Sequence, residues 1–381
     1  MKIALLTTDN REHYGDHAHP QPYFGTAPEA LLQGFVALPE VEVHIISCLQ
    51  KPVPSPEKIA PNIFFHSLVV PKIGWMRTFY QGCIRATRKK LREIQPDIVH
   101  GQGSERDCAL AAAFSGFSNV VTIHGNMQAI ADIYGQGLGS FHWLAAKLET
   151  VALKKTGGVF CNSAYTESLV ASRAKKIWRV PNALRTEFFA PIPQKTPGAK
   201  PIILNIGVIE PRKQQVELLA VARRLHERGL KFELQFIGKQ TVGNAYSNTF
   251  AEQVMAAEKS GYVRQLGLLA TAQIIAAMDT AHALVHFPTE EAFGLVTAEA
   301  LARGLKYFGS AVGGGVEIAS GVPGVELFPA HDFGALEIAL ANWLQQGCPA
   351  PANAAQIMRQ RYHPEVIARR HVEIYQEVLR R

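Results

Sequence analysis

The chain has 381 residues, of which 47% are hydrophobic and 19% charged, and its formal net charge is +7. A chain of this length exceeds one ordinary hydrophobic core, so we expect two domains, and the composition excludes a disordered protein. No apolar run is long enough to span a bilayer, and the N-terminus predicts a buried strand rather than a signal peptide. The five cysteines are scattered, which argues against disulfides or a zinc cluster and favours a reducing cytoplasm.

The first half of the chain alternates short apolar runs with longer helical patterns. Thr26 is the N-cap candidate of the first long helix, and Pro96 ends a later one. In chain order we expect strands over 2–8, 41–47, 63–69, 97–100, 120–124, 158–162 and 177–180. Between them we expect helices over 27–38, 77–94, 106–114, 141–155 and 165–172.

A proline-rich segment, 189–201, cannot build a packed helix and indicates a linker between domains. After it we expect strands over 202–207, 232–238, 263–266 and 283–287, and helices over 214–228, 250–260, 271–278, 333–346, 353–361 and 364–379. Such alternation predicts parallel sheets with helices on both faces. Ligands of these sheets bind beyond the carboxyl ends of the strands, so we expect the functional residues in the loops there.

The loop after the first strand is polar and carries His13, His17 and His19, with Asp16 between them. Histidines at this spacing can converge on a metal ion. A polar loop without a metal is the simpler interpretation, and we favour it.

Other strand ends offer groups that suit an anionic ligand. Gly25 and Gly207 let the backbone approach a phosphate or sugar closely. Arg212 and Lys213 begin a predicted helix, where the helix dipole disfavours cations, so we infer a pyrophosphate site there. His124 ends a strand and either points into a cleft or is a structural histidine; the sequence supports both equally.

The stretch 288–304 links a buried strand to a helix through a polar loop and carries Glu291 and Glu299. On one helix these carboxylates would lie about 12 Å apart, beyond the roughly 5–9.5 Å of a glycosidase pair. We therefore expect Glu291 in the loop and Glu299 on the helix, each accepting hydrogen bonds from hydroxyls of one ligand. The amides near Gly294 and Leu295 suit phosphate oxygens.

Together these motifs resemble the retaining glycosyltransferases of family 4. The resemblance covers essentially the whole length and rests on residues 96–100, 121–125, 180–182, 207–213, 291–295 with Glu299, and 313–314 with Glu317. It implies an α/β fold of two Rossmann-like domains that face each other across a cleft, the GT-B architecture. The implied domains are an acceptor-side domain over 1–185 plus 363–381 and a nucleotide-sugar domain over 186–362. The last helix of the chain would cross back to the acceptor-side domain.

The resemblance also assigns a role to each candidate residue. The implied catalytic residues are His124, Arg212, Lys213 and Glu291, with the two cations neutralising the leaving diphosphate. The implied donor-binding residues are Gly25, Gly207, Arg212, Lys213, Phe293, Gly294, Leu295 and Glu299, with Glu299 on the ribose. Two positions depart from the family, Val208 where an arginine is frequent and Thr26 where a second glycine is common. We expect Arg212 to supply the charge that Val208 lacks.

The implied activity is metal-independent transfer of a hexose from a UDP-, GDP- or ADP-sugar to an acceptor hydroxyl, with retention of configuration and no cofactor. The acceptor would be a sugar, a glycan or a lipid-linked glycan, in polysaccharide or glycolipid biosynthesis. A sugar-nucleotide epimerase of the same architecture and a non-catalytic sugar-nucleotide-binding protein are the alternatives.

A basic run, 85–92, follows Trp75, Met76, Phe79 and Tyr80. The run lacks interleaved aromatic residues, so we expect no nucleic-acid binding. It would suit peripheral contact with an anionic membrane on the cytoplasmic side. A buried helix with one basic face is the interpretation that we favour.

Overall fold

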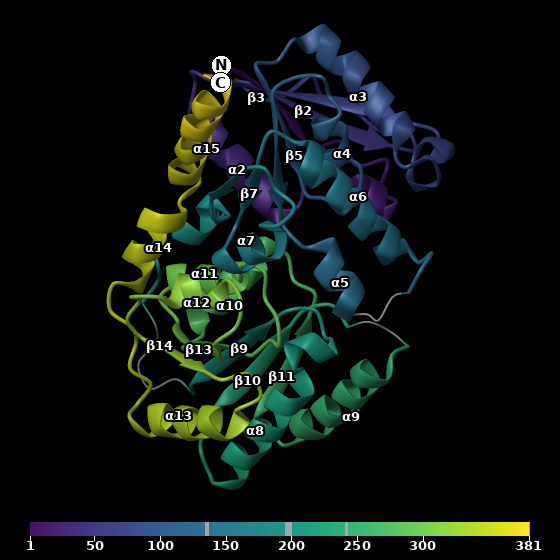
Figure 1. The fold of residues 1–381 in the computed structure, drawn as a ribbon. Coiled ribbons are helices and arrows are strands. Elements are labelled where there is room, and N and C mark those ends of the chain that lie inside the picture. The colour runs from purple at the N-terminus through teal and green to yellow at the C-terminus, as the bar shows by residue number, and fades with distance from the viewer. Residues whose placement is uncertain (134–136, 195–199, 241–242, 381) are drawn as a thin grey trace. The chain divides into compact units, whose positions relative to one another are not determined.

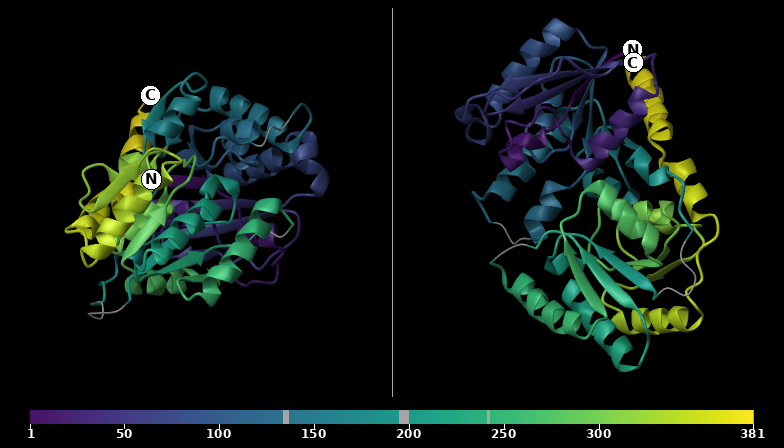
Figure 2. Two further views of the ribbon diagram at one scale, coloured as in Figure 1. Left: turned by 90° about the horizontal axis from the view of Figure 1, so that it is seen from below. Right: turned by 180° about the vertical axis from the view of Figure 1, so that it is seen from behind.

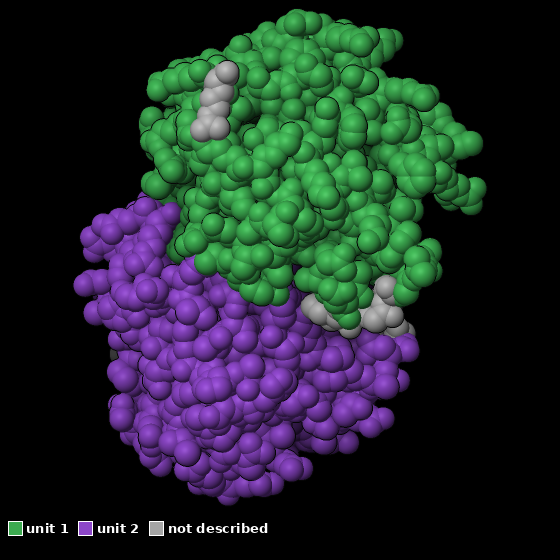
Figure 3. All heavy atoms as spheres, in the orientation of Figure 1, with its two compact units in different colours: residues 1–186, 362–381 green, residues 187–361 purple. Residues whose placement is uncertain are grey.

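The computed structural model describes residues 1–133, 137–194, 200–240 and 243–380. The chain divides into two compact units (Figure 3): unit 1 contains Met1–Thr186 and Tyr362–Arg381, and unit 2 contains Glu187–Arg361. The sequence places these divisions after residues 185 and 362. No helix among the described residues is both long enough and apolar enough to cross a membrane.

Unit 1 is built on an eight-stranded sheet with the order β3-β4-β2-β1-β5-β6-β7-β8 (Figure 1). Neighbouring strands are parallel except β3, a three-residue edge strand that the sequence did not predict. The strands are β1 Lys2–Leu6, β2 Glu42–Leu49, β3 Lys58–Ala60, β4 Ile63–Val69, β5 Ile98–Gln102, β6 Asn119–Ile123, β7 Val159–Cys161 and β8 Ile177–Arg179. The helices of its first stretch are α1 Asn10–Tyr14, α2 Thr26–Val36, α3 Gln81–Ile94, α4 Cys108–Ala113, α5 Met127–Ile133, α6 Phe141–Lys155 and α7 Ala164–Val170.

Two helix starts differ from the sequence prediction. Gly25, not Thr26, is the N-cap of α2. The helix expected from residue 77 begins at Gln81, because Phe79 and Tyr80 adopt left-handed backbone angles (φ 52° and 60°) that interrupt a helix. Two 3₁₀ turns, Lys72–Gly74 and Met76–Thr78, occupy the preceding segment.

The end of the chain returns to unit 1, as the sequence predicted. Helix α15 (Pro364–Leu379) lies along α2, and Figure 2 shows the two side by side. Gly34 makes this contact tight, because a Cβ atom there would lie 2.2 Å from the carbonyl oxygen of Pro364. The hydroxyl of Tyr375 hydrogen-bonds His100 of β5, so α15 is tied to the sheet as well as to α2.

Unit 2 is built on a six-stranded, wholly parallel sheet with the order β11-β10-β9-β12-β13-β14. Counted from β9, this order is 3-2-1-4-5-6, which is that of a dinucleotide-binding Rossmann sheet. The strands are β9 Ile202–Ile206, β10 Glu233–Ile237, β11 Val263–Gly267, β12 Ala283–His286, β13 Lys306–Ser310 and β14 Val325–Phe328. The helices are α8 Gln215–Glu227, α9 Ala245–Lys259, α10 Thr271–Thr280, α11 Leu295–Ala302, α12 Gly315–Ala319, α13 Phe333–Gln345 and α14 Ala354–Tyr362, the last of which ends at the first residue of the returning segment.

Several short elements of unit 2 were missed by the sequence prediction, namely β13, α12 and β14, and α9 begins five residues before the expected 250. The side chain of Asn244 caps α9 by accepting a hydrogen bond from the amide of Ser247, which explains the earlier start. The two sheets, parallel apart from the edge strand β3, and their covering helices confirm the predicted fold class of two Rossmann-like domains.

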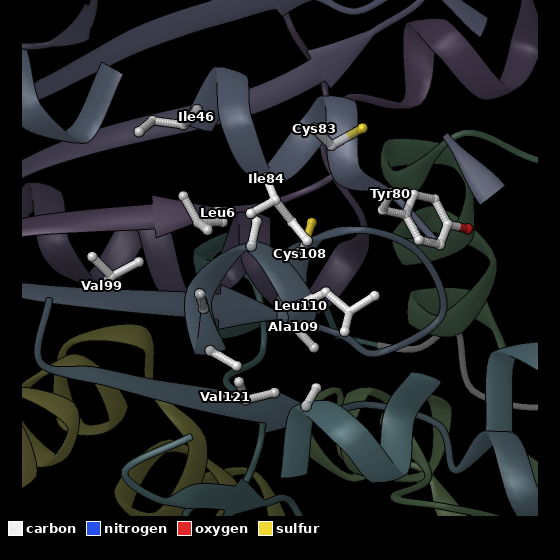
Figure 4. Close-up of a cluster of buried hydrophobic side chains, with 14 of the residues drawn as sticks. Leu6, Ile46, Tyr80, Cys83, Ile84, Val99, Cys108, Ala109, Leu110 and Val121 are labelled. Carbon is white, nitrogen blue, oxygen red and sulfur yellow. The ribbon is translucent and has the colours of Figure 1, made fainter. Parts of the chain in front are cut away.

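Apolar side chains from both faces of the unit 1 sheet form its core. Figure 4 shows one cluster, in which Leu6, Ile46, Val99 and Val121 of the strands pack near residues of α3 and α4. Cys48, Cys83, Cys108 and Cys161 are all buried and unpaired by disulfides, so the strand cysteines Cys48 and Cys161 pack as small apolar residues.

Candidate functional site

Strand order reverses in unit 2 between β9 and β12, so the loops that follow these strands diverge and leave room for a ligand. Hydrogen bonds hold the two loops together. The amide of Thr289 donates to the carbonyl of Arg212 at 2.8 Å, and the side-chain amide of Gln214 donates to the carbonyl of Phe287 at 2.7 Å. The sequence predicted residues 207–213 and 288–294 as two separate candidate segments for ligand binding. The fold places these two segments side by side.

Lys213, Glu291 and His286 meet where the two loops join. Lys213 Nζ lies 2.6 Å from Glu291 Oε2, and His286 Nε2 lies 3.2 Å from the same oxygen and 3.4 Å from Lys213 Nζ. The side chains of Lys213 and Glu291 are 11% and 17% exposed, and that of His286 is buried. A cation and an anion are thus held in a largely dry position at the switch point of the sheet.

The charges of this cluster are set by its burial and its contacts. Burial alone would raise the pKa of Glu291, but the hydrogen bond with His286 and the charge of Lys213 outweigh it and hold this pKa well below its ordinary value. Burial, reinforced by Lys213, lowers the pKa of His286 to about 4. At neutral pH Glu291 is therefore a carboxylate, and a neutral His286 donates its Nε2 proton to it.

Arg212 lies beside this cluster but has other partners. Its guanidinium donates to Glu210 Oε1 at 2.8 Å, to the carbonyl of Glu290 at 2.9 Å and to Glu290 Oε2 at 3.3 Å. Burial alone would lower the pKa of Arg212, but the carboxylates of Glu210, Glu291 and Glu290 raise it. Its charge is therefore balanced by glutamates in this structure, and whether it replaces the arginine absent at Val208 stays a prediction.

The loop that carries Glu291 is supported from behind by the turn after β13. A Cβ atom at Gly313 (φ 53°) would lie 1.8 Å from the carbonyl oxygen of Glu291, and one at Gly314 would lie 2.7 Å from that of Ala292. The amide of Gly314 donates to the carbonyl of Glu291 at 3.0 Å. Only glycine lets these two backbones approach so closely, which gives this glycine pair a physical role.

Helix α11 begins directly after this loop. Gly294 is its N-cap and has a φ of 96°, so a residue with a side chain would be strained there. Leu295 is the first helical residue, Phe293 is buried, and Glu299 lies on the helix with 8% exposure. Glu291 in the loop and Glu299 on the helix is the arrangement that their spacing favoured. Their roles toward a ligand stay predictions.

Gly207 directly follows β9 and lies next to the side chain of Lys213. A Cβ atom at Gly207 would lie 3.9 Å from this side chain, an ordinary contact, whereas one at Gly238 would lie 1.9 Å from the carbonyl oxygen of Gly207. Gly238, which the sequence did not single out, therefore makes the close backbone approach to the end of β9. Val208 is 45% exposed.

His124 lies at the carboxyl edge of the unit 1 sheet, within a network of polar side chains. Its Nε2 donates to Gln102 Oε1 at 2.9 Å, and the amide nitrogen of Gln102 lies 3.2 Å from His100 Nε2. His100 also contacts Thr122 Oγ1 at 2.7 Å and Tyr375 of α15. Burial lowers the pKa of His124 to about 4 against an opposing interaction with the Asn182 side chain, and its buried Nδ1 makes no hydrogen bond within 3.5 Å in the described chain. A neutral imidazole is thus held with one lone pair unused.

Glu149 of α6, which the sequence did not identify, fixes the loops around His124. Its buried carboxylate accepts hydrogen bonds from Ser104 Oγ (2.7 Å), the Asn126 side chain (3.2 Å), the Met127 amide (2.9 Å) and Arg173 Nη1 (2.9 Å). These partners follow β5 and β6 or lie after α7. A glutamate within a helix gives no sequence signal of burial, so only the fold could reveal this role.

The predicted histidine loop does not gather its histidines. His17 Nε2 lies 3.4 Å from Glu12, and His19 Nδ1 lies 2.7 Å from the carbonyl of Gln21. Gly25 has an ordinary φ of −63°, and a Cβ atom there would make only an ordinary contact with Pro28. Its backbone angles therefore do not require glycine. Its predicted contact with a ligand stays a prediction, which would depend on the room left by the missing side chain.

Among the described residues, one group has side chains close enough to share a metal ion: Cys48, Cys83 and Asp107, whose ligand atoms lie within 4.8 Å of one another. The hydrogen bond with Cys83 and burial raise the pKa of Cys48, and burial raises that of Asp107. Metal ligands must be deprotonated, so these shifts oppose metal binding in this core.

The segment considered for membrane contact is largely internal. Trp75 and Tyr80 are 5% and 3% exposed, whereas Phe79 is 53% exposed. Helix α3, which carries the basic run, buries Cys83, Ile84, Thr87, Leu91 and Ile94 along one side. This is the buried helix with a basic face that we favoured, and membrane contact stays a prediction.

Comparison with known proteins matches almost the whole chain. A family model described as Glycosyltransferase Family 4 matches residues 29–188, and one described as Glycosyl transferases group 1 matches residues 189–361. No curated protein sequence matches the chain.

Among solved structures, the chain is similar to sucrose-phosphate synthase from Thermosynechococcus elongatus, with a TM-score of 0.77, 18% identity and coverage of 100% of this chain and 99% of that one. It is also similar to Anabaena HepE in complex with UDP (0.70, 16%, 99% and 100%). A third similar structure is the catalytic domain of starch synthase IV from Arabidopsis thaliana bound to ADP and acarbose (0.69, 12%, 100% and 99%). At these identities the likeness shows the shared fold.

Proposed function

Because the chain belongs to the family 4 and group 1 glycosyltransferases, we propose that it moves a sugar from a nucleotide-diphosphate donor to an acceptor hydroxyl with retention of configuration. The observation that carries this proposal is the cluster of Lys213, Glu291 and His286 at the switch point of the unit 2 sheet. This is the place where a parallel sheet of this order receives a nucleotide.

The reaction requires stabilisation of negative charge on the leaving diphosphate. The acceptor oxygen forms a bond to the anomeric carbon while the bond from that carbon to the diphosphate oxygen breaks. The electron pair of the broken bond stays on the diphosphate, which also takes the acceptor proton. Lys213 is a preorganised cation in a mostly buried position, where a charge acts more strongly than in water.

Glu291 and His286 have supporting parts in this proposal. The carboxylate of Glu291 positions Lys213 before the donor arrives, and it can then accept hydrogen bonds from sugar hydroxyls. Glu299 would take the ribose hydroxyls, and the amides at the start of α11 would take phosphate oxygens. Since Lys213 supplies the charge, we propose that transfer needs no divalent metal and no cofactor.

His124 would contact the reacting sugar through its unused Nδ1. Its low pKa makes it a neutral hydrogen-bond acceptor near pH 7 rather than a cation. A sugar hydroxyl is a suitable donor for such a lone pair. This role rests on the proposed transfer reaction.

The direct test is an assay of the purified protein with UDP-, GDP- and ADP-sugars and a panel of sugar acceptors. UDP and ADP come first because HepE and starch synthase IV were solved with these nucleotides. Mass spectrometry should detect an acceptor that has gained one sugar, and the anomeric coupling constant should show the configuration of the donor. Activity that survives EDTA is expected.

The same assay separates the alternatives. Conversion of the nucleotide sugar in the absence of any acceptor would indicate an epimerase. Tight nucleotide-sugar binding with no product across the panel would indicate a binding protein. An inverted product would contradict the retaining mechanism while leaving glycosyl transfer in place.

A further inference from the structure

Unit 1 contains a cavity of about 560 Å³ that plays no part in the site described above. Its walls come from segments that follow β1, β2, β4 and β5, so it lies at the carboxyl edge of the sheet, the edge that also carries His124. Its volume is within the roughly 300–1,000 Å³ of small-molecule sites. The lining residues that matter here are Glu12, Lys72, Trp75, Arg77, Tyr80 and Arg106.

Arg106 is a fixed cation in the wall of this cavity. Its guanidinium carbon lies 4.7 Å from the centre of the Trp75 ring, which is itself held by a 3.0 Å hydrogen bond from Nε1 to the carbonyl of Val70. Within the described chain, its side chain makes no ion pair within 4.0 Å and no hydrogen bond. A stacked guanidinium with unused N–H groups is prepared to bind an anion from outside the protein.

Tyr80 supplies a second unused polar group. Tyr80 as a whole residue is 3% exposed, and its ring packs edge-on against Trp75. Figure 4 shows its oxygen directed away from the apolar cluster. Among the residues that the structure describes, this hydroxyl has no hydrogen-bond partner, and Tyr80 lines the cavity. The hydroxyl is therefore an unpaired donor and acceptor at the cavity wall, where a polar ligand can bind it.

The remaining polar groups suggest the shape of that ligand. Lys72 and Arg77 line the cavity and, like Arg106, have no carboxylate partner within 4.0 Å in the described part of the chain. Glu12 also lines it, and its Oε2 is occupied by the amide of Gln50 at 2.9 Å. The cavity thus combines three unpaired cations, an aromatic wall and one anchored carboxylate.

From these groups we infer that the cavity binds a phosphate-bearing sugar, with the phosphate on Arg106, Lys72 and Arg77 and the hydroxyls near Glu12. Three cations match a phosphate, which carries close to two negative charges, better than the single charge of a sugar carboxylate. Carboxylates such as Glu12 accept hydrogen bonds from sugar hydroxyls. The inference deepens the proposed function and rests on it, because the phosphorylated sugar would be the acceptor.

Isothermal titration calorimetry of the full chain tests the inference without a donor. The probes are glucose 6-phosphate, glucuronate and glucose. The expected order of affinity is glucose 6-phosphate first, and Arg106→Gln should weaken its binding at least tenfold, since a charged hydrogen bond is lost. Arg106→Lys should restore part of it. Arg85→Gln is the matched control, because Arg85 is exposed on α3 outside the cavity.

Two sources of the phosphate are separated by a second arm, co-sedimentation with phosphatidylcholine vesicles that do or do not contain a polyprenyl diphosphate-linked hexose. Exposed Ile73 and Phe79 lie in the same segment as Lys72 and Arg77. Capture only by the vesicles with the linked hexose, lost in Arg106→Gln, supports a lipid-linked acceptor. Binding of glucose 6-phosphate alone supports a soluble one. Equal binding of glucose and both anions, or no effect of Arg106→Gln in either arm, overturns the inference.

The double variant Lys72→Gln, Arg77→Gln provides the same test should Arg106→Gln unfold, as judged by circular dichroism. Failure of this inference is distinct from failure of the proposed function. If only the inference is wrong, UDP binding and sugar transfer to a neutral acceptor would persist. If the proposed function is wrong, the protein would bind the phosphorylated sugar but would transfer no sugar from any donor.

Discussion

The ammonium of Lys213 lies 2.6 Å from the carboxylate of Glu291, and the two residues come from the loops that follow β9 and β12. Neither loop is catalytically informative by itself, because cations and glutamates in loops are common. Their meeting at the switch point creates a charged pair, and in the proposed mechanism the donor diphosphate binds there. The incoming phosphates would compete with Glu291 for Lys213 and so release the carboxylate toward the sugar.

Replacing Lys213 with alanine should reduce kcat for sugar transfer by about 10²–10³-fold, the usual cost of one transition-state charge partner. The measurement is a steady-state assay with the donor that the panel identifies. Lys231→Ala, at an exposed lysine of the same unit, should transfer sugar like the wild type. Near-normal kcat in a folded Lys213→Ala protein would remove Lys213 from the mechanism.

Gly313→Ala should disturb the Glu291 loop although Gly313 touches no ligand in the proposed mechanism. The new methyl group would meet the carbonyl oxygen of Glu291 at 1.8 Å, and the φ of 53° would be strained as well. We expect a lower thermal midpoint and at least tenfold weaker transfer. Gly315→Ala is the matched control, since a Cβ atom there meets nothing within 4 Å. Equal behaviour of the two variants would contradict a tight contact between the turn and the loop.

Glu149→Gln should destabilise unit 1 by about 3 kcal/mol, since it leaves Arg173 without its buried counter-charge and turns an acceptor into a donor. Urea unfolding followed by tryptophan fluorescence measures the loss. Glu167→Gln removes an exposed pair with Arg179 and should cost less than about 1 kcal/mol. A similar cost in both variants would show that Glu149 does not anchor the loops after β5 and β6.

Stability should fall as the pH drops from about 6.5 to about 4, and His371 should carry part of this effect. Burial lowers its pKa from the ordinary 6.5 to about 4, so in this window the unfolded chain binds a proton that the folded chain does not. One such histidine contributes a slope of at most about 1.4 kcal/mol per pH unit. His371→Phe should reduce the measured slope, whereas His226→Phe, at an exposed histidine, should not. An unchanged slope in His371→Phe would contradict the inferred pKa.

Local sequence signals predicted the long helices best. Helix α6 runs from 141 to 155 as expected because Ser140 caps it and two lysines end it, and α15 begins at Pro364 as expected. In contrast, β13 and β14 have five and four residues and contain or adjoin glycines, so periodicity carried too little information there. Glycine has a low strand propensity, so the local signal was weak at these two strands.

The candidate site was predicted only in part, because local sequence signals do not report contacts between residues that are far apart in the chain. Lys213 and Glu291 stand out as polar residues just after strands, but their contact joins residues 78 positions apart and depends on the strand order. His286 interrupts an apolar strand immediately before the loop, which is a signal that could have identified it. Glu149 offered none, because its burial arises from loops that fold over α6.

The return of α15 to α2 and His100 has a consequence for biosynthesis. Unit 2 occupies one uninterrupted stretch of the chain. Unit 1, in contrast, is completed by α15, which is available only after residues 362–381 have been translated. On the ribosome, unit 2 can therefore mature first although unit 1 is synthesised before it. Until α15 has been made, Gly34 and His100 lack the contacts that they have in the folded chain.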